Sequence, residues 1–464
     1  MKILKQMRKT GLAMCVAVSM IFSNYITVQA QGKWPDQPTT QSPCAIVMEA
    51  STGTVLYDKN MEEKHYPASI TKIMTACIAL EHSSLDEIVT FSEDAVYNTE
   101  GSGIARDVGE QMTMEQCLYG MMLESSNECA YAIAEHVGGT LENFVDMMNQ
   151  KAEELGCVNT HFMNPHGLHD NNHYTCCYDM ALIARAAWEN EDFRTITGTG
   201  NYAIPPTNKH PNDTTYLANH NKLLHEFDQD SSYIYPYCVG GKTGYTTVAN
   251  RTLVTYAEKD GMTLICVVMN TRTPYEWTDS IKLFDYYLNN FALYPVAQYE
   301  TRFENNQIQS DILEEVNPFV SISKQASIVL PVSADFLDTT AEITYDYASE
   351  DVLGSIQYTY SGHAVGRADI VKSQSEVEGY VFDNQKESSG EDSVTKIEIH
   401  VWQIVVAVLG VILLGLLIWF GKKIIDNFYI IKHKYFSKPK RDKRYKTIKY
   451  NYRSRRGRGR RRRW

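Results

Sequence analysis

The chain has 464 residues, of which 44% are hydrophobic and 22% charged, and a formal net charge of −12. This length predicts two to three domains with a large apolar core, and the composition excludes a mainly disordered or fibrous protein. The charge is unevenly distributed: residues 422–464 hold 19 lysines and arginines against two acids, whereas residues 1–30 hold four cations and no acid. The middle of the chain is therefore strongly acidic, whereas its two ends are basic, which indicates that the ends have different functions from the middle.

Residues 1–30 have the layout of a secretory signal peptide. A cationic stretch precedes an apolar run from Gly11 to Phe22, and Val28-Gln29-Ala30 places aliphatic and small residues where signal peptidases read them. We expect cleavage after Ala30 and export of the rest of the chain.

The segment from 31 to 292 predicts an antiparallel sheet covered by helices. Apolar runs on either side of Ser51-Thr52-Gly53 indicate a hairpin, and Asp260-Gly261 joins two further strands. Because helical spacing fills the region between the first and last strands, we expect an α+β domain. The expected elements, in chain order, are a hairpin at 45–57, helices between about 69 and 187, a hairpin at 252–269 and a final helix at 281–291.

The chain beyond residue 292 divides into four segments. Short alternating apolar runs predict a small β-rich domain. Further on, Val401 to Phe420 is 20 residues without a charge, which as a helix spans about 30 Å, the thickness of a bilayer core. Because cations follow at once, the positive-inside rule places the tail in the cytoplasm and residues 31–398 outside, with the lipid bilayer as a partner; a buried core helix is the alternative. The segments are a β-rich domain (293–382), a linker (383–398), a transmembrane helix (399–421) and a basic tail (422–464).

Nine of the ten cysteines remain after removal of the signal, an odd number scattered through a large domain. We expect mostly reduced thiols that pack as small apolar groups, and a disulfide framework is the alternative.

The first motif with chemical meaning is Ser69-Ile70-Thr71-Lys72, which follows Pro67 at a predicted helix start. Spacing of three places Ser69 and Lys72 on one helical face. A serine hydroxyl is a weak nucleophile until a base takes its proton, and a lysine whose pKa is lowered by burial or another cation can be that base. A solvent-facing pair on a helix is the alternative.

Two further motifs follow in order. Ser125-Ser126-Asn127 lies between predicted helices, where its side chains can project into a cleft or cap the second helix. The run from Gly240 to Tyr245 contains Lys242-Thr243-Gly244 directly before a predicted strand. Glycines let a substrate backbone approach, and Lys with Thr can bind a carboxylate, whereas a glycine-rich turn with an exposed lysine is the alternative.

With these motifs in this order, the chain resembles a serine-type D-alanyl-D-alanine carboxypeptidase, a low-molecular-mass penicillin-binding protein of the DD-peptidase and β-lactamase-like superfamily. The resemblance covers about 42–291 and implies an α+β, transpeptidase-like fold. It implies removal of the terminal D-alanine from peptidoglycan stem pentapeptides through an acyl-serine, covalent inhibition by β-lactam antibiotics, and no cofactor. The pattern departs at Ser126, Glu128-Cys129 and Cys176-Cys177. Further segments that match the family's sequence pattern lie at 53–57, 101–103, 119–123, 134–135, 164–168, 173–174, 179–181 and 219–224.

The resemblance also implies a role for each motif residue, although which group serves as base in such enzymes is disputed. The catalytic residues would be Ser69 as nucleophile, Lys72 as general base and Ser125 as proton relay; the substrate-binding residues would be Asn127, Lys242, Thr243 and Gly244; and the oxyanion hole would be the backbone N–H groups of Ser69 and Tyr245.

Four other interpretations can be compared on the sequence. The histidines at 161, 166, 169 and 173 match no zinc motif, so structural roles and no metal are expected. Lipid contact accounts for the basic tail, so nucleic acid is not expected as a partner, and protein partners are not indicated. A β-lactamase needs a further carboxylate, normally in an E-x-x-L-N loop that is absent between Asn127 and Lys242. A non-catalytic wall-binding protein would not need the nucleophile and its base.

Overall fold

The computed structural model describes residues 33–225, 231–300, 320–345 and 351–372. These belong to one compact unit, Met1–Val377. The predicted signal peptide, linker, transmembrane helix and tail lie outside the described residues and stay predictions. The predicted domain boundary at 292 lies within the described residues and also stays a prediction. Within the described ranges, no helix is both long and apolar enough to cross a membrane.

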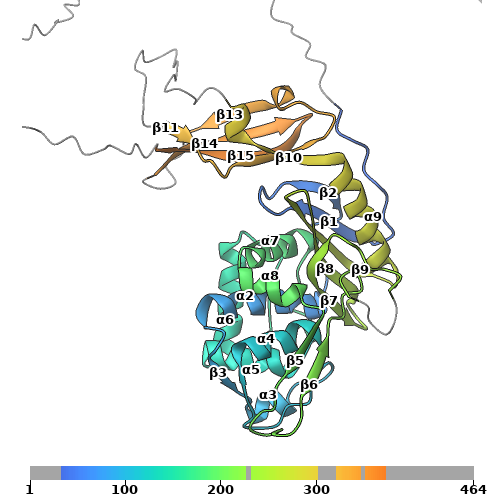
Figure 1. Cartoon of the computed structure of the whole chain (residues 1–464), viewed down its shortest axis with the longest axis vertical. Helices are drawn as coiled ribbons and strands as arrows, with labels where there is room; N and C mark the ends of the chain where they lie inside the picture. The colour runs from blue at the N-terminus through green and yellow to red at the C-terminus, as the bar shows by residue number, and fades with distance from the viewer. Residues whose placement is uncertain (1–32, 226–230, 301–319, 346–350, 373–464) are drawn as a thin grey trace, which may run out of the picture. The chain divides into compact units, whose positions relative to one another are not determined.

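A five-stranded antiparallel sheet in the order β2-β1-β9-β8-β7 forms the centre of the fold (Figure 1). Both predicted hairpins are confirmed: Val47 of β1 pairs with Tyr57 of β2, and β8 turns into β9 through Asp260-Gly261, two residues with positive φ. The first and last predicted strands of this segment, β1 and β9, therefore pair in one sheet. The strands are β1 (Cys44–Glu49), β2 (Val55–Lys59), β7 (Cys238–Thr246), β8 (Asn250–Lys259) and β9 (Met262–Thr271).

Each face of this sheet is buried in its own core. Along β1, Ile46 and Met48 belong to the core beneath the main group of helices, whereas Ala45 and Val47 belong to the core on the opposite face. This alternation is what a two-residue strand period produces. The helical group lies on one side of the sheet and α9 on the other (Figure 1). The elements of the helical side are η1 (Ala68–Thr71), α2 (Lys72–His82), α3 (Glu93–Tyr97), α4 (Met114–Leu123), α5 (Asn127–Gly138), α6 (Leu141–Glu154), α7 (Cys177–Trp188) and α8 (Glu191–Gly198), with the strand pairs β3 (Ile88–Thr90) and β4 (Gln111–Thr113), and β5 (Asn201–Ile204) and β6 (Thr215–Ala218).

Helix α9 (Tyr275–Asn290) starts earlier than the sequence predicted, because its first turns are polar yet buried. Asp279 is 4% exposed, and its Oδ2 accepts hydrogen bonds from the backbone N–H groups of Gln41 and Ser42 and from the Ser42 hydroxyl. A buried carboxylate with three donors is well satisfied. These bonds tie the segment before β1 to α9.

The segment beyond α9 is rich in strands. β10 pairs with β12, and a four-stranded sheet has the order β11-β15-β14-β13. Nine cysteines within the described ranges are free thiols. The elements are β10 (Phe291–Pro295), α10 (Val296–Tyr299), β11 (Val320–Ile322), β12 (Ser327–Pro331), η3 (Phe336–Asp338), β13 (Thr340–Thr344), β14 (Val352–Tyr360) and β15 (His363–Lys372).

Candidate active site

Ser69 lies in the 3₁₀ turn η1, which leads directly into α2 at Lys72. Ala68, just before it, has a φ of 53°, a conformation that L residues rarely adopt and that clusters at functional turns. Ser69 is half-buried, and Lys72 Nζ lies 3.1 Å from its Oγ. Lys72 is fully buried, so the alternative of a solvent-facing pair is wrong. The two predicted residues face each other within one helical turn.

The amine of Lys72 has a complete set of partners. Besides Ser69 Oγ, Nζ contacts Asn127 Oδ1 and the backbone carbonyl oxygen of His166, each at 2.7 Å. Burial lowers the pKa of Lys72 well below its usual value, and the charge of Lys242 lowers it further, because both disfavour the ammonium form. A neutral amine has two N–H donors and one lone pair. When both donors bind Asn127 and His166, which accept only, the lone pair remains for the Ser69 hydroxyl.

The 125–127 loop connects α4 to α5, as predicted. Ser125 is buried and has a φ of 62°. The hydroxyl of Ser126 accepts a hydrogen bond from a backbone N–H of the next turn, so Ser126 caps α5. Asn127 directs Oδ1 to Lys72 and donates through Nδ2 to the carbonyl of Glu100 at 2.5 Å. The structure thus brings Asn127 into contact with Lys72. Ser125, two residues before Asn127, is buried in the same loop.

The run from Gly240 to Tyr245 is not a turn but lies within β7, an edge strand of the central sheet. Lys242 and Gly244 pair in register with residues of β8. A Cβ at Gly244 would lie 2.9 Å from the backbone nitrogen of Ser69, closer than a carbon can stand without displacing something. Glycine at this position therefore allows β7 to lie directly against the nucleophile turn. Tyr245, the next residue along β7, is 53% exposed.

Lys242 is the second buried lysine of the site, 1% exposed. Its Nζ donates to the carbonyl of Thr243 at 3.0 Å, its one hydrogen bond to any of the described residues. Burial lowers the pKa of Lys242 to about 7, and the carboxylate of Glu124 opposes this shift. Glu124 is itself engaged, since it accepts from Ala218 N at 2.8 Å and lies 3.0 Å from His220 Nε2. Lys242 therefore retains donors for a further anionic partner.

A cavity of about 300 Å³ adjoins the Lys242-Thr243-Gly244 segment. Its walls come from β7, β8 and the start of α9. Cationic and hydroxyl side chains at this end of the site suit an anionic, peptide-like ligand. The lining residues are His220, Lys222, Thr243, Gly244, Arg251, Thr252, Thr273, Glu276 and Trp277.

The loop at 164–167 contributes to the site, although no role was predicted for it. The carbonyl of His166 accepts from Lys72. Gly167 has a φ of 86°, and a Cβ there would lie 1.9 Å from the carbonyl oxygen of Ala68. Only glycine can occupy such a position, because both the conformation and the space exclude a side chain. The glycine after Asn-Pro-His was the available sequence signal for a close approach.

His173 supports the nucleophile turn from behind. Its Nδ1 accepts from Met163 N at 3.1 Å, so Nε2 carries the ring proton and donates to Thr71 Oγ1 at 2.9 Å. Thr71 in turn donates to the carbonyl of Ala68. Burial lowers the pKa of His173, and of His166, to about 3. Both rings are therefore neutral at physiological pH and act as fixed hydrogen-bonding groups.

A serine with a lysine one turn on, a serine–asparagine loop, and a lysine on an edge strand define a class of serine acyl-enzymes. In that class the parts surround one nucleophile on a helix-covered antiparallel sheet, and the class comprises the penicillin-binding proteins and class A β-lactamases. A comparison with known protein families identifies the family: the family model described as D-alanyl-D-alanine carboxypeptidase matches residues 31–273 of this chain. The chain belongs to this family, and it is a serine-type D-Ala-D-Ala carboxypeptidase.

Individual relatives agree with this assignment. The D-alanyl-D-alanine carboxypeptidase DacF of Bacillus subtilis is 32% identical, over 70% of this chain and 81% of the relative. Among solved structures, the Streptomyces K15 DD-transpeptidase is 31% identical with a TM-score of 0.50, covering 54% of this chain and 98% of its own. A D-alanyl-D-alanine carboxypeptidase from Mycobacterium tuberculosis has a TM-score of 0.50 at 29% identity, covering 55% and 94%. The predicted transpeptidase-like α+β fold is confirmed.

Proposed function

We propose that this carboxypeptidase removes the terminal D-alanine of peptidoglycan stem pentapeptides through an acyl intermediate on Ser69. The observation that carries the proposal is the contact between Ser69 Oγ and the buried amine of Lys72 at 3.1 Å. A nucleophile and a base of lowered pKa in hydrogen-bonding distance are the minimal parts of such a reaction.

In the acylation step, Ser69 Oγ attacks the carbonyl carbon of the scissile D-Ala-D-Ala bond while Lys72 takes the hydroxyl proton. The carbonyl oxygen becomes an oxyanion that the backbone N–H groups of Ser69 and Tyr245 stabilise. Collapse forms the Oγ–C ester and breaks the C–N bond. The proton passes from Lys72 through Ser125 to the leaving amine, which departs as free D-alanine.

Substrate recognition in this proposal depends on charge. Lys242 and Thr243 bind the free carboxylate of the terminal D-alanine, and Gly244 gives the substrate access to the strand. Asn127 contributes to holding the peptide backbone. The buried position of Lys242 supports this role, because a charge-assisted hydrogen bond is strongest where water is excluded.

Deacylation needs a water molecule at the ester, and here a carboxypeptidase and a β-lactamase differ. Free D-alanine leaves, so water can enter with help from Lys72 or Ser125. An opened β-lactam keeps its leaving group tethered and crowds the water. Glu128 is the carboxylate that acts electrostatically on Lys72, but its Oε1 already accepts from Ile104 N. We therefore expect β-lactam antibiotics to form persistent adducts.

The proposed location is the outer face of the cell membrane. The predicted signal at 1–30, the predicted transmembrane helix at 399–421 and the basic tail at 422–464 support one C-terminal span with the catalytic domain outside. Protease added to intact cells should digest the Ser69 domain and spare the tail. Degradation of the tail from outside would reject this topology.

The function is tested by incubating the purified full chain with a pentapeptide that ends in D-Ala-D-Ala and assaying free D-alanine. We expect release by the wild type and none by Ser69→Ala. Penicillin should leave one adduct that lasts minutes or longer by intact-protein mass spectrometry. An adduct that clears within seconds, with the peptide untouched, would instead identify a β-lactamase.

A further inference from the structure

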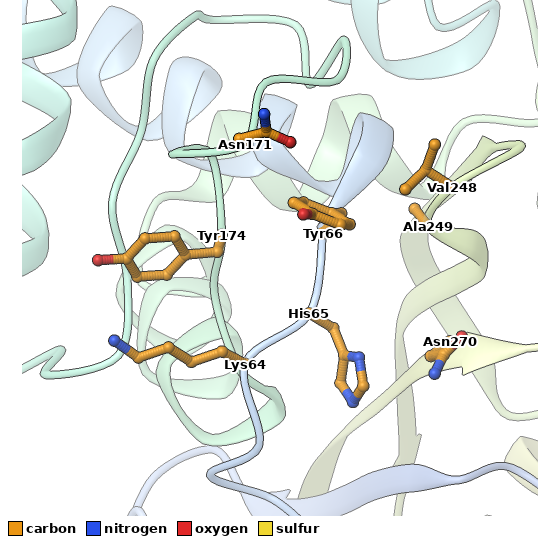
Figure 2. A pocket seen from close by; sticks show the side chains of 8 residues that line it. All are labelled: Lys64, His65, Tyr66, Asn171, Tyr174, Val248, Ala249 and Asn270. Carbon is orange, nitrogen blue, oxygen red and sulfur yellow. The ribbon is translucent and has the colours of Figure 1, made fainter.

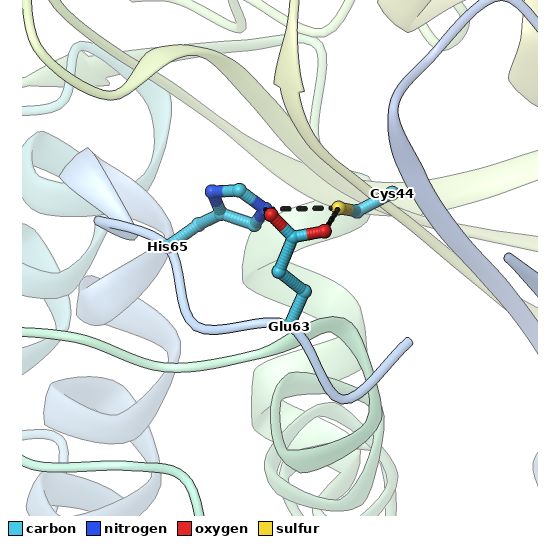
Figure 3. A group of neighbouring side chains, drawn as sticks. All are labelled: Cys44, Glu63 and His65. Carbon is cyan, nitrogen blue, oxygen red and sulfur yellow. Dashed lines mark hydrogen bonds and ion pairs between the residues drawn. The ribbon is translucent and has the colours of Figure 1, made fainter. Parts of the chain in front are cut away.

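A thiol, a carboxylate and an imidazole, three side chains that can each bind a metal ion, converge at the start of β1. Cys44 is the first residue of β1, and Glu63 and His65 lie in the loop between β2 and η1 (Figure 3). Their ligand atoms all lie within 4.8 Å of one another, the one such group of three among the residues that the structure describes. We infer that Cys44, Glu63 and His65 form a zinc-binding site.

Two of the three donor separations are close to those of a zinc tetrahedron, and the third is shorter. Zn–S and Zn–N or Zn–O bonds of about 2.3 and 2.0–2.1 Å at tetrahedral angles separate neighbouring ligand atoms by roughly 3.4–3.6 Å. Here Cys44 Sγ lies 3.8 Å from Glu63 Oε2, and His65 Nε2 lies 3.5 Å from Glu63 Oε1. Cys44 Sγ and His65 Nε2 are 2.9 Å apart, so a small outward movement of one side chain admits the ion.

Hydrogen bonds fix the two chain segments that carry the donors. His65 exchanges two backbone hydrogen bonds with Thr175, at 2.7 and 2.9 Å. The Asn60 side chain, in the same loop, donates to the carbonyl of Pro43, the residue before Cys44. The loop and the first residue of β1 are therefore fixed to each other before a ligand arrives, which reduces the ordering cost of binding.

A cavity adjoins the group on the histidine side. His65 lines a cavity of about 340 Å³, together with Tyr66 and Asn270 of β9. Figure 2 shows the His65 side chain directed towards Asn270 and away from Lys64 and Tyr174. Three protein ligands beside an open cavity leave a coordination position for water or a small ligand, as in zinc sites that are not purely structural.

The donor set favours zinc over the hard cations. A thiolate with an imidazole selects Zn²⁺ against Mg²⁺ and Ca²⁺, which prefer oxygen ligands. On binding, the Cys44 S–H bond breaks, its proton goes to solvent, and a Zn–S bond forms. One thiolate and one carboxylate then neutralise the two positive charges of the ion.

A zinc ion at this position would fasten the segment that leads into the active site, because His65 is followed by Tyr66-Pro67 and the nucleophile turn. This inference does not rest on the proposed function. Its readout is bound metal, whether or not the enzyme releases D-alanine.

The test uses the full chain, stripped with a chelator and then dialysed against Zn²⁺ or Co²⁺. We expect one equivalent of zinc by elemental analysis, a thiolate-to-cobalt charge-transfer band with Co²⁺, and a Tm that rises with zinc. Glu63→Gln should weaken zinc binding by at least about tenfold, the loss seen even when outer-shell partners of a metal are removed. Glu62→Gln, the same change at the neighbouring exposed residue, should bind zinc as the wild type does.

Cys44→Ser should abolish the cobalt band, and Cys157→Ser should retain it. Should Cys44→Ser not fold, the exposed pair Glu63→Gln and Glu62→Gln decides alone. Retention of no zinc by the wild type would overturn the site. Equal zinc affinity in Glu63→Gln and Glu62→Gln would also overturn it, because the ion would then be bound elsewhere.

Discussion

The helical side and the sheet side of the active site each bury one lysine, and the two are satisfied differently. On the helical side, Lys72 contacts Ser69, Asn127 and the carbonyl of His166. On the sheet side, Lys242 has one hydrogen bond to a described residue, the carbonyl of Thr243. Burial lowers the pKa of both.

The difference in partners separates two kinds of function. A neutral amine held by two acceptors has a fixed lone pair, which is what a general base needs. A buried amine with spare donors and a pKa of about 7 gains a proton when an anion arrives, which is what a carboxylate receptor needs. The same residue type thus serves as base on α2 and as receptor on β7.

The largest loss of acylation rate should come from removing the amine of Lys72. Lys72→Met leaves Ser69 without a proton acceptor, so penicillin acylation should slow by about 10²–10⁴-fold. Rapid-mixing mass spectrometry of the adduct measures this rate. Lys151→Met is the control, because Lys151 pairs with Glu81 away from the site. Acylation of Lys72→Met within threefold of the wild-type rate would assign the base elsewhere.

A smaller loss of acylation rate should follow from moving β7 away from the nucleophile turn η1. In Gly244→Ala the new Cβ would lie 2.9 Å from Ser69 N, so β7 or the nucleophile turn must shift. A displacement of about 1 Å can cost on the order of 10²-fold in rate. Gly261→Ala, in a turn where a Cβ meets nothing within 4 Å, should lose stability but retain the acylation rate. Equal rates in the two variants would contradict the close packing of β7 on η1.

The pH profile should distinguish the lysines. Because the pKa of Lys242 is lowered to about 7, the free enzyme carries this charge below pH 7 and loses it above. The kcat/KM for a pentapeptide should therefore fall towards tenfold per pH unit on the alkaline side. A substrate with an amidated C-terminus should lack this limb. Both substrates should keep the acid limb, which protonation of Lys72 causes. An alkaline limb shared by both substrates would dissociate it from Lys242.

The smallest effect concerns stability, and its sign differs between the two residues. The pKa of Lys242 is lowered from 10.5 to about 7, so between these values the unfolded chain binds more protons and stability rises with pH. Lys242→Met should raise the free energy of unfolding at pH 7 by about 1–3 kcal/mol, and the gain should shrink by pH 10. Lys72→Met should lower it, because Asn127 and His166 lose their donor. Urea unfolding at both pH values measures this, and a destabilised Lys242→Met would reverse the comparison.

Much of the site could be predicted from sequence because side-chain chemistry carries a local signature. Ser69 and Lys72 are three residues apart, and a helix start brings them together. The His166 contribution was missed because a backbone carbonyl has no residue type. A turn is the alternative for the run around Lys242 because glycines favour turns, whereas here Gly244 serves the contact of β7 with Ser69. The grouping of Cys44 with His65 depends on how β1 meets a later loop, which no local pattern encodes.

The division of roles is tested most directly by combining Lys242→Gln with amidation of the substrate and measuring kcat/KM for all four pairs. Each single change should cost about 2–4 kcal/mol in transition-state stabilisation, because each removes one side of the same charge-assisted contact. The two changes together should cost little more than either alone. Losses that add in full would contradict the account, since Lys242 and the carboxylate would then act independently.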